Sequence, residues 1–474
     1  RSPSRGLGDV YKRQIAEYSL FYKMNKRQKK NKKTTKRFPS HTATMELVID
    51  RIGGKGDGIS NNSSSNSNSN VKENQPYFIP GTLPGEHIIT RPIFKTAEGV
   101  FGQLLEITKA STERVSAPCT YFGICGGCSL QHWNTVPYQE WKINRIKNVT
   151  KKVISPNTVF SKLIPSEMQA RRRADISIKR FETKSVVGFH ERDSHRIVDI
   201  QSCDLLDPEI INLSNAFRPI SHLFIPIGES SRISINKLDN GLDILIYLQS
   251  EPSLEGLEAF NKLAHSHNLS RISMKISSAA DIIPIIEKRM PHIEFSGVKI
   301  SPPPGAFLQA TKRGTQSITE AVLSGVTGKK TILELFSGCG TLTIPLHHQA
   351  TVHAVEGDPF AADALRKGTV KAAIHNKISV EIRDLLRNPM PADELSKYDA
   401  VVFDPPRSGA KKQVEEIVKN GPATVVAVSC NPNTFARDSQ ILVNGGYQLK
   451  KITSIDQFLW SPHVELVAEF YREK

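Results

Sequence analysis

The stretch "TILELFSGCGTLTIPL", residues 331–346, decides the fold predicted for the C-terminal part of this chain. Its first five residues are mostly apolar and have the length of a buried strand. Gly338 and Gly340 let the backbone turn tightly and approach a ligand closely, and the apolar residues after them favour a helix. A strand, a glycine turn and a helix N-terminus follow one another in this way where α/β proteins bind a ligand.

The alternation of strand and helix continues from here to the C-terminus. Four more apolar segments of strand length follow: "TVHAVEG" (351–357), "ISVEIRD" (378–384), "YDAVVFD" (398–404) and "TVVAVSC" (424–430). Helical segments precede the first, second and fourth of them. Two last segments, 447–458 and 463–472, are typical of an antiparallel pair. This order predicts an α/β fold with a doubly wound, Rossmann-like parallel sheet over residues 305–474.

Acidic side chains stand at the ends of two of these strands. Ligands of open α/β sheets collect at the carboxyl ends of the strands, where Glu356 could hold both hydroxyls of a ribose and Asp384 an adenine amino group. Each acid alone could equally be an ordinary surface or capping residue. The chain has no phosphate-binding G-x-x-x-x-G-K-[ST] motif, and a nucleoside ligand without phosphates points to S-adenosylmethionine (SAM).

The fourth and fifth strands deliver Asp404 and Cys430 to the same edge. Two prolines in "DPPRSGA" (404–410) make a rigid turn after Asp404, which aims its carboxylate at the pocket. Cys430 ends the next strand, beside the predicted methyl donor. A lone cysteine is more often a small packing residue, but this position favours a chemical role.

Composition places the chain among globular proteins of two or three domains. It has 474 residues, of which 38% are hydrophobic, and it contains no apolar run of membrane-spanning length and no secretory signal. We therefore expect a cytoplasmic protein without membrane contact, whose cysteines stay reduced.

The positive charge is concentrated at the N-terminus. The formal net charge is +16, and residues 1–37 alone hold thirteen Lys and Arg residues against two acids. Such a tail either binds nucleic acid through its phosphates or is a disordered solubilising segment, and both readings stay open. The chain begins at Arg1, so that Met24 is a candidate for the natural start.

The remaining sequence suggests two further domains. Residues 1–44 are expected to be a disordered basic tail, and 45–112 a small β-barrel with a low-complexity Asn/Ser insertion at 60–72. Small barrels of this kind often bind oligonucleotides. Residues 113–304 mix strands and helices and are expected to form an α+β central domain.

Four cysteines of the central domain have the spacing of a metal site. Cys119, Cys125 and Cys128 form C-x5-C-x2-C, and Cys203 lies far downstream. Four thiolates could bind zinc or an iron–sulfur cluster. A zinc ribbon more often has two C-x2-C pairs, and only one is present here.

Several motifs taken together resemble one family. They are "CTYFGICGGCSLQHW" (119–133), "GFHERDSHRIVDIQSC" (188–203), "FLQAT" (307–311), "ELFSGCGTLTIPL" (334–346), "DPPRSG" (404–409), "SCNP" (429–432) and "HVE" (463–465). In this order they resemble the RNA uridine-5-methyltransferase family, specifically its iron–sulfur, TRAM-domain-containing 23S rRNA branch. The resemblance covers the chain from about residue 45 to the C-terminus.

This resemblance implies an activity and a set of site residues. It implies SAM-dependent methylation of C5 of a uridine, most specifically in 23S rRNA, by a monomer with Cys430 as nucleophile and Glu465 as proton acceptor. A thiolate that adds to C6 of uracil makes C5 reactive toward the methyl group. The implied SAM contacts are Gln309, Phe336, Gly338, Gly340, Thr341, Glu356, Asp384 and Asp404. The implied [4Fe–4S] ligands are Cys119, Cys125, Cys128 and Cys203.

Two positions depart from the family pattern, and other functions remain open. Thr311 and Thr341 stand where the family commonly has Asn, and a hydroxyl can still form a hydrogen bond there. The alternatives are the same reaction on a tRNA loop, an amine methyltransferase that uses "DPPR" alone, and a non-catalytic RNA-binding protein. In the basic cluster Arg171–Arg173, one or two arginines are expected to contact phosphate and another to pair with a structural acid.

Overall fold

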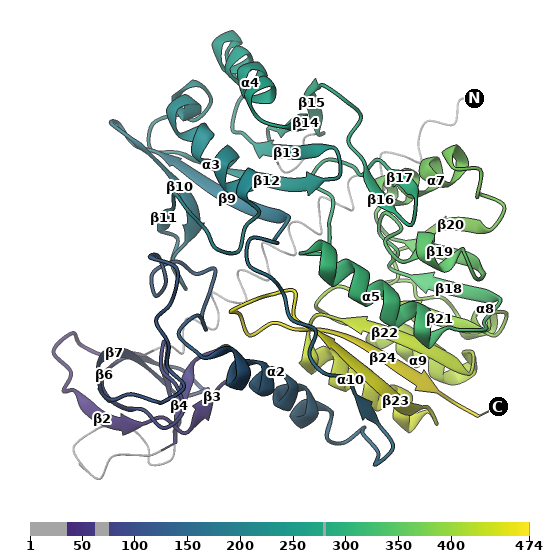
Figure 1. Cartoon of the computed structure of the whole chain (residues 1–474), viewed down its shortest axis with the longest axis horizontal. Coiled ribbons are helices and arrows are strands. Elements are labelled where there is room, and N and C mark those ends of the chain that lie inside the picture. The colour runs from purple at the N-terminus through teal and green to yellow at the C-terminus, as the bar shows by residue number, and fades with distance from the viewer. Residues whose placement is uncertain (1–35, 62–74, 278–280, 474) are drawn as a thin grey trace. The chain divides into compact units, whose positions relative to one another are not determined.

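The computed structural model describes residues 36–61, 75–277 and 281–473, which group into two compact units (Figure 1). The first unit holds the described residues up to Gly123, with Cys128–Pro137 and part of Lys275–Asp281. The second holds Ile124–Gly127, Tyr138–Met274 and the chain from Ile282 onward. The expected basic tail up to residue 35 and most of the Asn/Ser insertion lie outside the described residues.

The first unit contains one seven-stranded sheet. Its strands are β1 (Lys36–Arg37), β2 (Met45–Val48), β3 (Arg51–Ile52), β4 (Gly58–Ser60), β5 (Tyr77–Ile79), β6 (His87–Lys95) and β7 (Val100–Lys109). The order is β1-β6-β7-β5-β4-β3, and β2 also pairs with β6. A small apolar core that includes Leu47, Ile79 and Val100 holds the sheet together.

The N-terminal part of the second unit is built on an antiparallel sheet. The order is β11-β10-β9-β12-β13-β14-β15. The strands are β9 (Arg173–Arg180), β10 (Ser185–His190), β11 (Ile197–Asp199), β12 (Ser230–Leu238), β13 (Gly241–Tyr247), β14 (Leu269–Lys275) and β15 (Ile283–Glu287). The helices of this region are α2 (Thr135–Thr150), α3 (Pro208–Ile220), the 3-10 helix η2 (Ser221–Leu223) and α4 (Leu254–Ser266). The hairpin β16 (Ile293–Phe295) and β17 (Val298–Ile300) follows.

The C-terminal part confirms the predicted α/β architecture. An eight-stranded sheet has the order β20-β19-β18-β21-β22-β24-β23-β8, drawn in green to yellow for its C-terminal strands in Figure 1. Its strands are β8 (Val159–Phe160), β18 (Thr331–Leu335), β19 (Thr351–Glu356), β20 (Ile378–Ile382), β21 (Ala400–Phe403), β22 (Thr424–Ser429), β23 (Gln448–Ile455) and β24 (Glu465–Tyr471). The pairs from β20 to β22 are parallel, and β24 pairs antiparallel with β22 and β23.

Helices cover both faces of this sheet because its central strands are apolar on both sides. Val401 and Val425 belong to one core cluster, whereas Val402 and Val426 belong to another. Successive side chains of a strand point to opposite faces, so each cluster marks one covered face. The helices are α5 (Lys312–Gly325), α6 (Thr343–Leu346), α7 (Pro359–Lys371), α8 (Ala392–Leu395), α9 (Lys411–Asn420) and α10 (Pro432–Asn444). Within the described ranges, no helix is both long and apolar enough to span a membrane.

Candidate active site

The strand β18 ends in a turn that depends on its glycines. Phe336 (φ 63°), Gly338 (φ 56°) and Gly340 (φ 93°) all have a positive φ, which is uncommon for a residue with a side chain. A Cβ atom at Gly340 would lie 2.5 Å from Leu365 Cδ1, whereas no atom of the described residues lies within 4 Å of one at Gly338. The backbone at Gly338 therefore faces open space, and that at Gly340 packs closely against α7.

The carboxylate of Glu356 is fixed against this turn. Its Oε2 accepts a hydrogen bond of 2.7 Å from the Gly338 N–H, and its Oε1 accepts one of 2.8 Å from the Asp358 N–H. Glu356 and the glycine turn thus hold each other in place at the ends of adjacent parallel strands.

Asp384 follows β20 and acts as a capping residue in this structure. Its Oδ1 accepts hydrogen bonds from the backbone N–H of Leu386 (3.1 Å) and of Arg387 (3.3 Å). Its Oδ2 lies 3.5 Å from Arg387 Nε. Asp384 therefore stands at the predicted sheet edge, in the capping role that the sequence left open.

A chain of hydrogen bonds connects two buried carboxyl groups at this edge. Gln309 Nε2 donates to Asp404 Oδ2 at 3.0 Å. Gln457 Nε2 donates to Gln309 Oε1 at 2.7 Å and to Glu465 Oε2 at 2.9 Å. The structure thus brings the predicted residues Gln309, Asp404 and Glu465 together, and it adds Gln457 between them.

Both carboxyl groups have a raised pKa. Burial raises the pKa of Glu465, and the negative charge of Asp404 adds to this effect. Burial also raises the pKa of Asp404, and the hydrogen bond from Gln309 partly offsets this effect by lowering it. Two carboxylates that share a buried site do not readily ionise together, so this pair favours holding one proton.

Cys430 follows β22 and lies within reach of these charges. Burial, then the charges of Glu465 and Asp404, raise the pKa of the Cys430 thiol to about 11, and Arg407 acts in the opposite direction. Arg407 Nη2 lies 3.1 Å from His463 Nε2. Burial and the Arg407 charge lower the pKa of His463 to about 4, so its neutral ring can accept this hydrogen bond.

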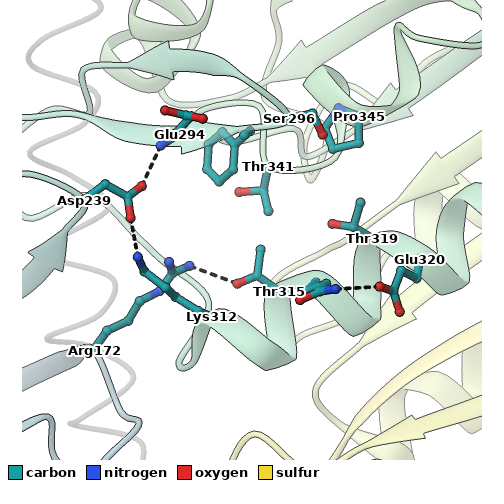
Figure 2. Close-up of a pocket in the computed structure, with 12 residues that line it drawn as sticks. Arg172, Asp239, Glu294, Ser296, Lys312, Thr315, Thr319, Glu320, Thr341 and Pro345 are labelled. Atoms are coloured by element: carbon teal, nitrogen blue, oxygen red, sulfur yellow. Dashed lines mark hydrogen bonds and ion pairs between the residues drawn. The ribbon is translucent and has the colours of Figure 1, made fainter.

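Thr341 lines a cleft of about 550 Å³, which Figure 2 shows. The cleft lies between α5, α6 and the β16–β17 hairpin, and its lining includes hydroxyl groups of Ser296, Thr315 and Thr319. Charged side chains of both signs also line it: Arg172, Lys312, Asp239, Glu294 and Glu320. Such a lining suits a ligand that carries both charges.

The basic cluster at Arg171–Arg173 contains one structural arginine. Arg172 is buried, and its guanidinium donates to the Gln309 carbonyl (3.0 Å) and to Thr315 Oγ1 (2.9 Å). These two hydrogen-bond acceptors are neutral, and the charge of Asp239 also acts on the Arg172 guanidinium. Arg173 lies over the ring of Phe307, with its guanidinium 4.9 Å from the ring centroid.

The four cysteines of the predicted metal site are all partly buried. Cys119 and Cys128 belong to the first unit, and Cys125 and Cys203 to the second. Over residues 36–61, 75–277 and 281–473, no three His, Cys, Asp or Glu side chains are grouped as a metal ion would require. The structure therefore does not support the predicted cluster.

Sequence reasoning missed two polar residues of the site. Gln457 lies just after β23, next to an acid, and nothing in "SIDQF" distinguishes it from a loop residue. Glu334 is fully buried in β18, between two leucines. Its Oε2 has no hydrogen-bond partner among the described residues, and burial raises its pKa to about 8. The sequence did contain a signal for Glu334, because an acidic residue in the middle of an apolar strand is unusual.

Comparisons with known proteins place the chain in a family. An uncharacterized RNA methyltransferase of Mesorhizobium japonicum is 36% identical over 425 residues, which are 90% of this chain and 97% of that protein. An uncharacterized RNA methyltransferase of Rhizobium meliloti is 36% identical over 433 residues, which are 90% of this chain and 99% of that protein. The chain therefore belongs to the RNA methyltransferase family, and the predicted enzyme class is confirmed.

More distant matches refine this picture. Residues 394–471 match the family model for tRNA (Uracil-5-)-methyltransferase. A 23S rRNA (uracil(1939)-C(5))-methyltransferase of Vibrio vulnificus is 26% identical over 92% of this chain and 98% of its own length. The solved structure of a Pyrococcus abyssi tRNA (uracil-54, C5)-methyltransferase with S-adenosyl-L-homocysteine superposes with a TM-score of 0.67, at 23% identity over 91% of this chain and all of that one. This likeness supports the fold.

Proposed function

We propose that the protein transfers the methyl group of SAM to C5 of a uridine in RNA, through a covalent bond between Cys430 and C6 of the uracil. The observation that carries the proposal is the placement of a cysteine beside two buried, hydrogen-bonded carboxyls at the carboxyl edge of the sheet. Packing alone does not require this combination of groups.

The proposed chemistry needs a nucleophile and a proton acceptor in turn. C5 of uracil is a poor nucleophile, and addition of the Cys430 thiolate to C6 turns C5 and O4 into an enolate. The enolate takes the methyl group, and Glu465 then removes the C5 proton as the bond from C6 to sulfur breaks. Cys430 thus starts and ends as a thiolate, and the proton leaves through Glu465.

The charges of the site suit this sequence of events. One proton shared by Asp404 and Glu465 removes part of the negative charge that disfavours the Cys430 thiolate. Arg407 then favours the thiolate. When the shared proton is on Asp404, the Glu465 carboxylate can accept the proton from C5.

The same edge of the sheet would hold SAM, which supplies a methyl group on a positively charged sulfur. Glu356 would bind its ribose hydroxyls, Gly338 would allow close approach of the backbone, and Asp384 would meet the adenine by exchanging its capping bonds. The contacts Gln309, Phe336, Gly340, Thr341 and Asp404 remain part of the proposal. The cleft in Figure 2 adjoins Thr341, and its mixed charges suit the amino-acid end of SAM.

The RNA substrate is proposed from the relatives. The Vibrio vulnificus relative acts on 23S rRNA by its name, and the Pyrococcus abyssi neighbour acts on tRNA. We favour 23S rRNA because of the resemblance to the 23S rRNA branch and the Vibrio vulnificus relative; the additional sheet does not discriminate, since the tRNA-acting neighbour matches 91% of this chain. The same proposal includes a cytoplasmic location and a monomeric state. It also includes three domains, at residues 45–112 (TRAM-like), 113–304 and 305–474.

The iron–sulfur cluster has no part in the proposed steps. Its assignment to Cys119, Cys125, Cys128 and Cys203 rests on sequence spacing and on the resemblance alone. Iron and acid-labile sulfide measured in anaerobically purified protein decide it. Four irons per chain would support the assignment, whereas one zinc per chain or no metal would refute it.

Product mapping tests the proposed reaction. The protein is incubated with SAM and a mixture of unmodified 23S rRNA and tRNA, and methylated fragments are located by mass spectrometry. We expect 5-methyluridine in rRNA fragments, and none from a Cys430→Ala protein. Product in tRNA alone would refute the rRNA assignment, and an N-methylated base would show the amine-methyltransferase alternative. No 5-methyluridine from protein that binds SAM would refute the proposed function.

A further inference from the structure

The side chain of Gln457 is buried, and both ends of its amide form hydrogen bonds. It is 2% exposed, and it lies between the end of β23 and the strand β24 that begins with Glu465. Its Oε1 accepts from the Ala310 N–H at 3.1 Å, and its Nε2 donates to Gln309 Oε1 at 2.7 Å and to Glu465 Oε2 at 2.9 Å. All of its amide hydrogens and one oxygen lone pair are therefore used.

The backbone N–H of Ala310 determines which way both glutamine amides point. A backbone N–H can only donate, so it must face the oxygen of Gln457, and the NH₂ group of Gln457 then faces Glu465. The second hydrogen of that NH₂ group meets the oxygen of Gln309, which leaves the NH₂ group of Gln309 for Asp404. Each carboxyl thus receives an N–H donor of fixed direction.

The neighbouring residues keep Gln457 from moving. Asp456, the residue before it, is 2% exposed and pairs at 2.7 Å with Lys142, which is fully buried in α2. Tyr138 of the same helix donates to Asp456 Oδ2 at 3.0 Å. On the other side, a Cβ atom at Gly314 would lie 2.7 Å from Gln457 Oε1, so only a glycine leaves room for the amide.

We propose that Gln457 is a positioning residue, which holds the Glu465 carboxyl in place to accept the proton from C5 and connects it through Gln309 to Asp404. The inference rests on the proposed role of Glu465. Because Gln457 holds Oε2, the other oxygen of Glu465 would receive the proton. A displacement of about 1 Å at a reacting group can lower a rate about 100-fold, which is the scale of effect expected here.

The pKa of Glu465 provides a second way to test the same inference. The groups that face Glu465 are Asp404, Cys430 and Arg407, with His463 two residues away. Burial and Asp404 raise the pKa of Glu465, and the hydrogen bond from Gln457, then Arg407, lower it. Loss of the Gln457 amide therefore moves the pKa of Glu465 upward, and the part of the pH–rate profile that depends on its carboxylate form shifts to higher pH.

The test compares two buried glutamines that carry the same substitution. Gln457→Met removes the amide at similar length. Gln413→Met is the matched control, because Gln413 is 1% exposed in α9 and its amide bonds to the backbone N–H and carbonyl of Met390 at 2.8 and 3.1 Å. Gln457→Glu is a nearly isosteric second variant, which keeps an oxygen for Ala310 in case the methionine variant does not fold. SAM binding verifies the fold of each.

We expect turnover to fall about 100-fold in Gln457→Met with the KM for RNA little changed, and to stay within about twofold in Gln413→Met. A covalent protein–RNA adduct with ordinary uridine RNA should accumulate in Gln457→Met and Gln457→Glu, as in Glu465→Gln, because release from Cys430 needs the proton acceptor. Turnover, adduct level and pH profile that match those of Gln413→Met would overturn this inference alone. Absence of any adduct in Glu465→Gln would instead overturn the proposed function and the inference that rests on it.

Discussion

The buried ion pair between Lys142 and Asp456 gives the most quantitative stability prediction. Their side chains are 0% and 2% exposed, and Lys142 Nζ lies 2.7 Å from Asp456 Oδ1. Lys142→Met keeps the length of the side chain but leaves a buried carboxylate without its counter-charge. Loss of one partner of a buried pair typically costs about 3–5 kcal/mol.

The remaining contacts of Asp456 place the expected cost at the lower end of this range. The Tyr138 hydroxyl still donates to Asp456 Oδ2 at 3.0 Å, and the Phe458 N–H donates to Oδ1 at 2.9 Å. Hydrogen bonds to a charged group contribute about 1.5–3 kcal/mol each, so these two donors offset part of the loss. We expect Lys142→Met to lower the free energy of unfolding by about 3 kcal/mol.

Urea unfolding followed by circular dichroism, together with a double-mutant cycle, measures this cost. Asp456→Asn removes the unpaired charge, so that Lys142→Met/Asp456→Asn should be more stable than Lys142→Met alone. A loss below about 1 kcal/mol in Lys142→Met would show that the pair is solvated and would refute the reasoning. A double variant less stable than the single variant would refute it as well.

Three further predictions concern the thiol, the glycine turn and Arg172. Because the pKa of Cys430 is raised to about 11, the rate of alkylation of Cys430 in RNA-free protein should rise about tenfold per pH unit from pH 7 to 10. Peptide mass spectrometry measures this rate. A rate that levels off below pH 8 would contradict the raised pKa. In thermal unfolding, Gly340→Ala should be less stable than Gly338→Ala by about 1–3 kcal/mol, because the Cβ of Ala at position 340 would meet Leu365. Gly338→Ala should chiefly weaken SAM binding. Equal stability of the two variants would exclude the clash. Arg172→Met should lower the free energy of unfolding by about 2 kcal/mol and leave the salt dependence of RNA binding unchanged. A weaker dependence of RNA affinity on salt concentration would identify Arg172 as a phosphate contact instead.

The sheet and its active edge could be predicted because their signals are local. Strands such as Val425–Val428 are apolar on both faces, and a turn rich in Gly or Pro follows the strands that end at Leu335 and Phe403. Parallel topology then brings the ends of β18 and β21 to one edge, which places Asp404 there. Gln309, which precedes α5, and Glu465, which begins the antiparallel strand β24, were expected only from the family resemblance.

Other features could not be predicted because they depend on contacts between distant segments. Gln457 differs from a loop glutamine only through its bonds to Gln309 and Ala310, which lie nearly 150 residues earlier in the chain. Arg172 is one of three consecutive arginines, and only its burial against the Gln309 carbonyl identifies it as structural. Cysteine spacing predicted a metal site, and the described residues show no group of side chains that would hold a metal ion.

Trapping with RNA that contains 5-fluorouridine tests the central claim most directly. Fluorine at C5 cannot be removed as a proton, so a methylated uracil should remain bonded to the enzyme. After incubation with SAM, denaturing electrophoresis and peptide mass spectrometry should find the nucleotide on the peptide that contains Cys430, and Cys430→Ala should give no adduct. A protein that methylates uridine RNA at C5 yet forms no such adduct, or forms it at another cysteine, would contradict the role assigned to Cys430.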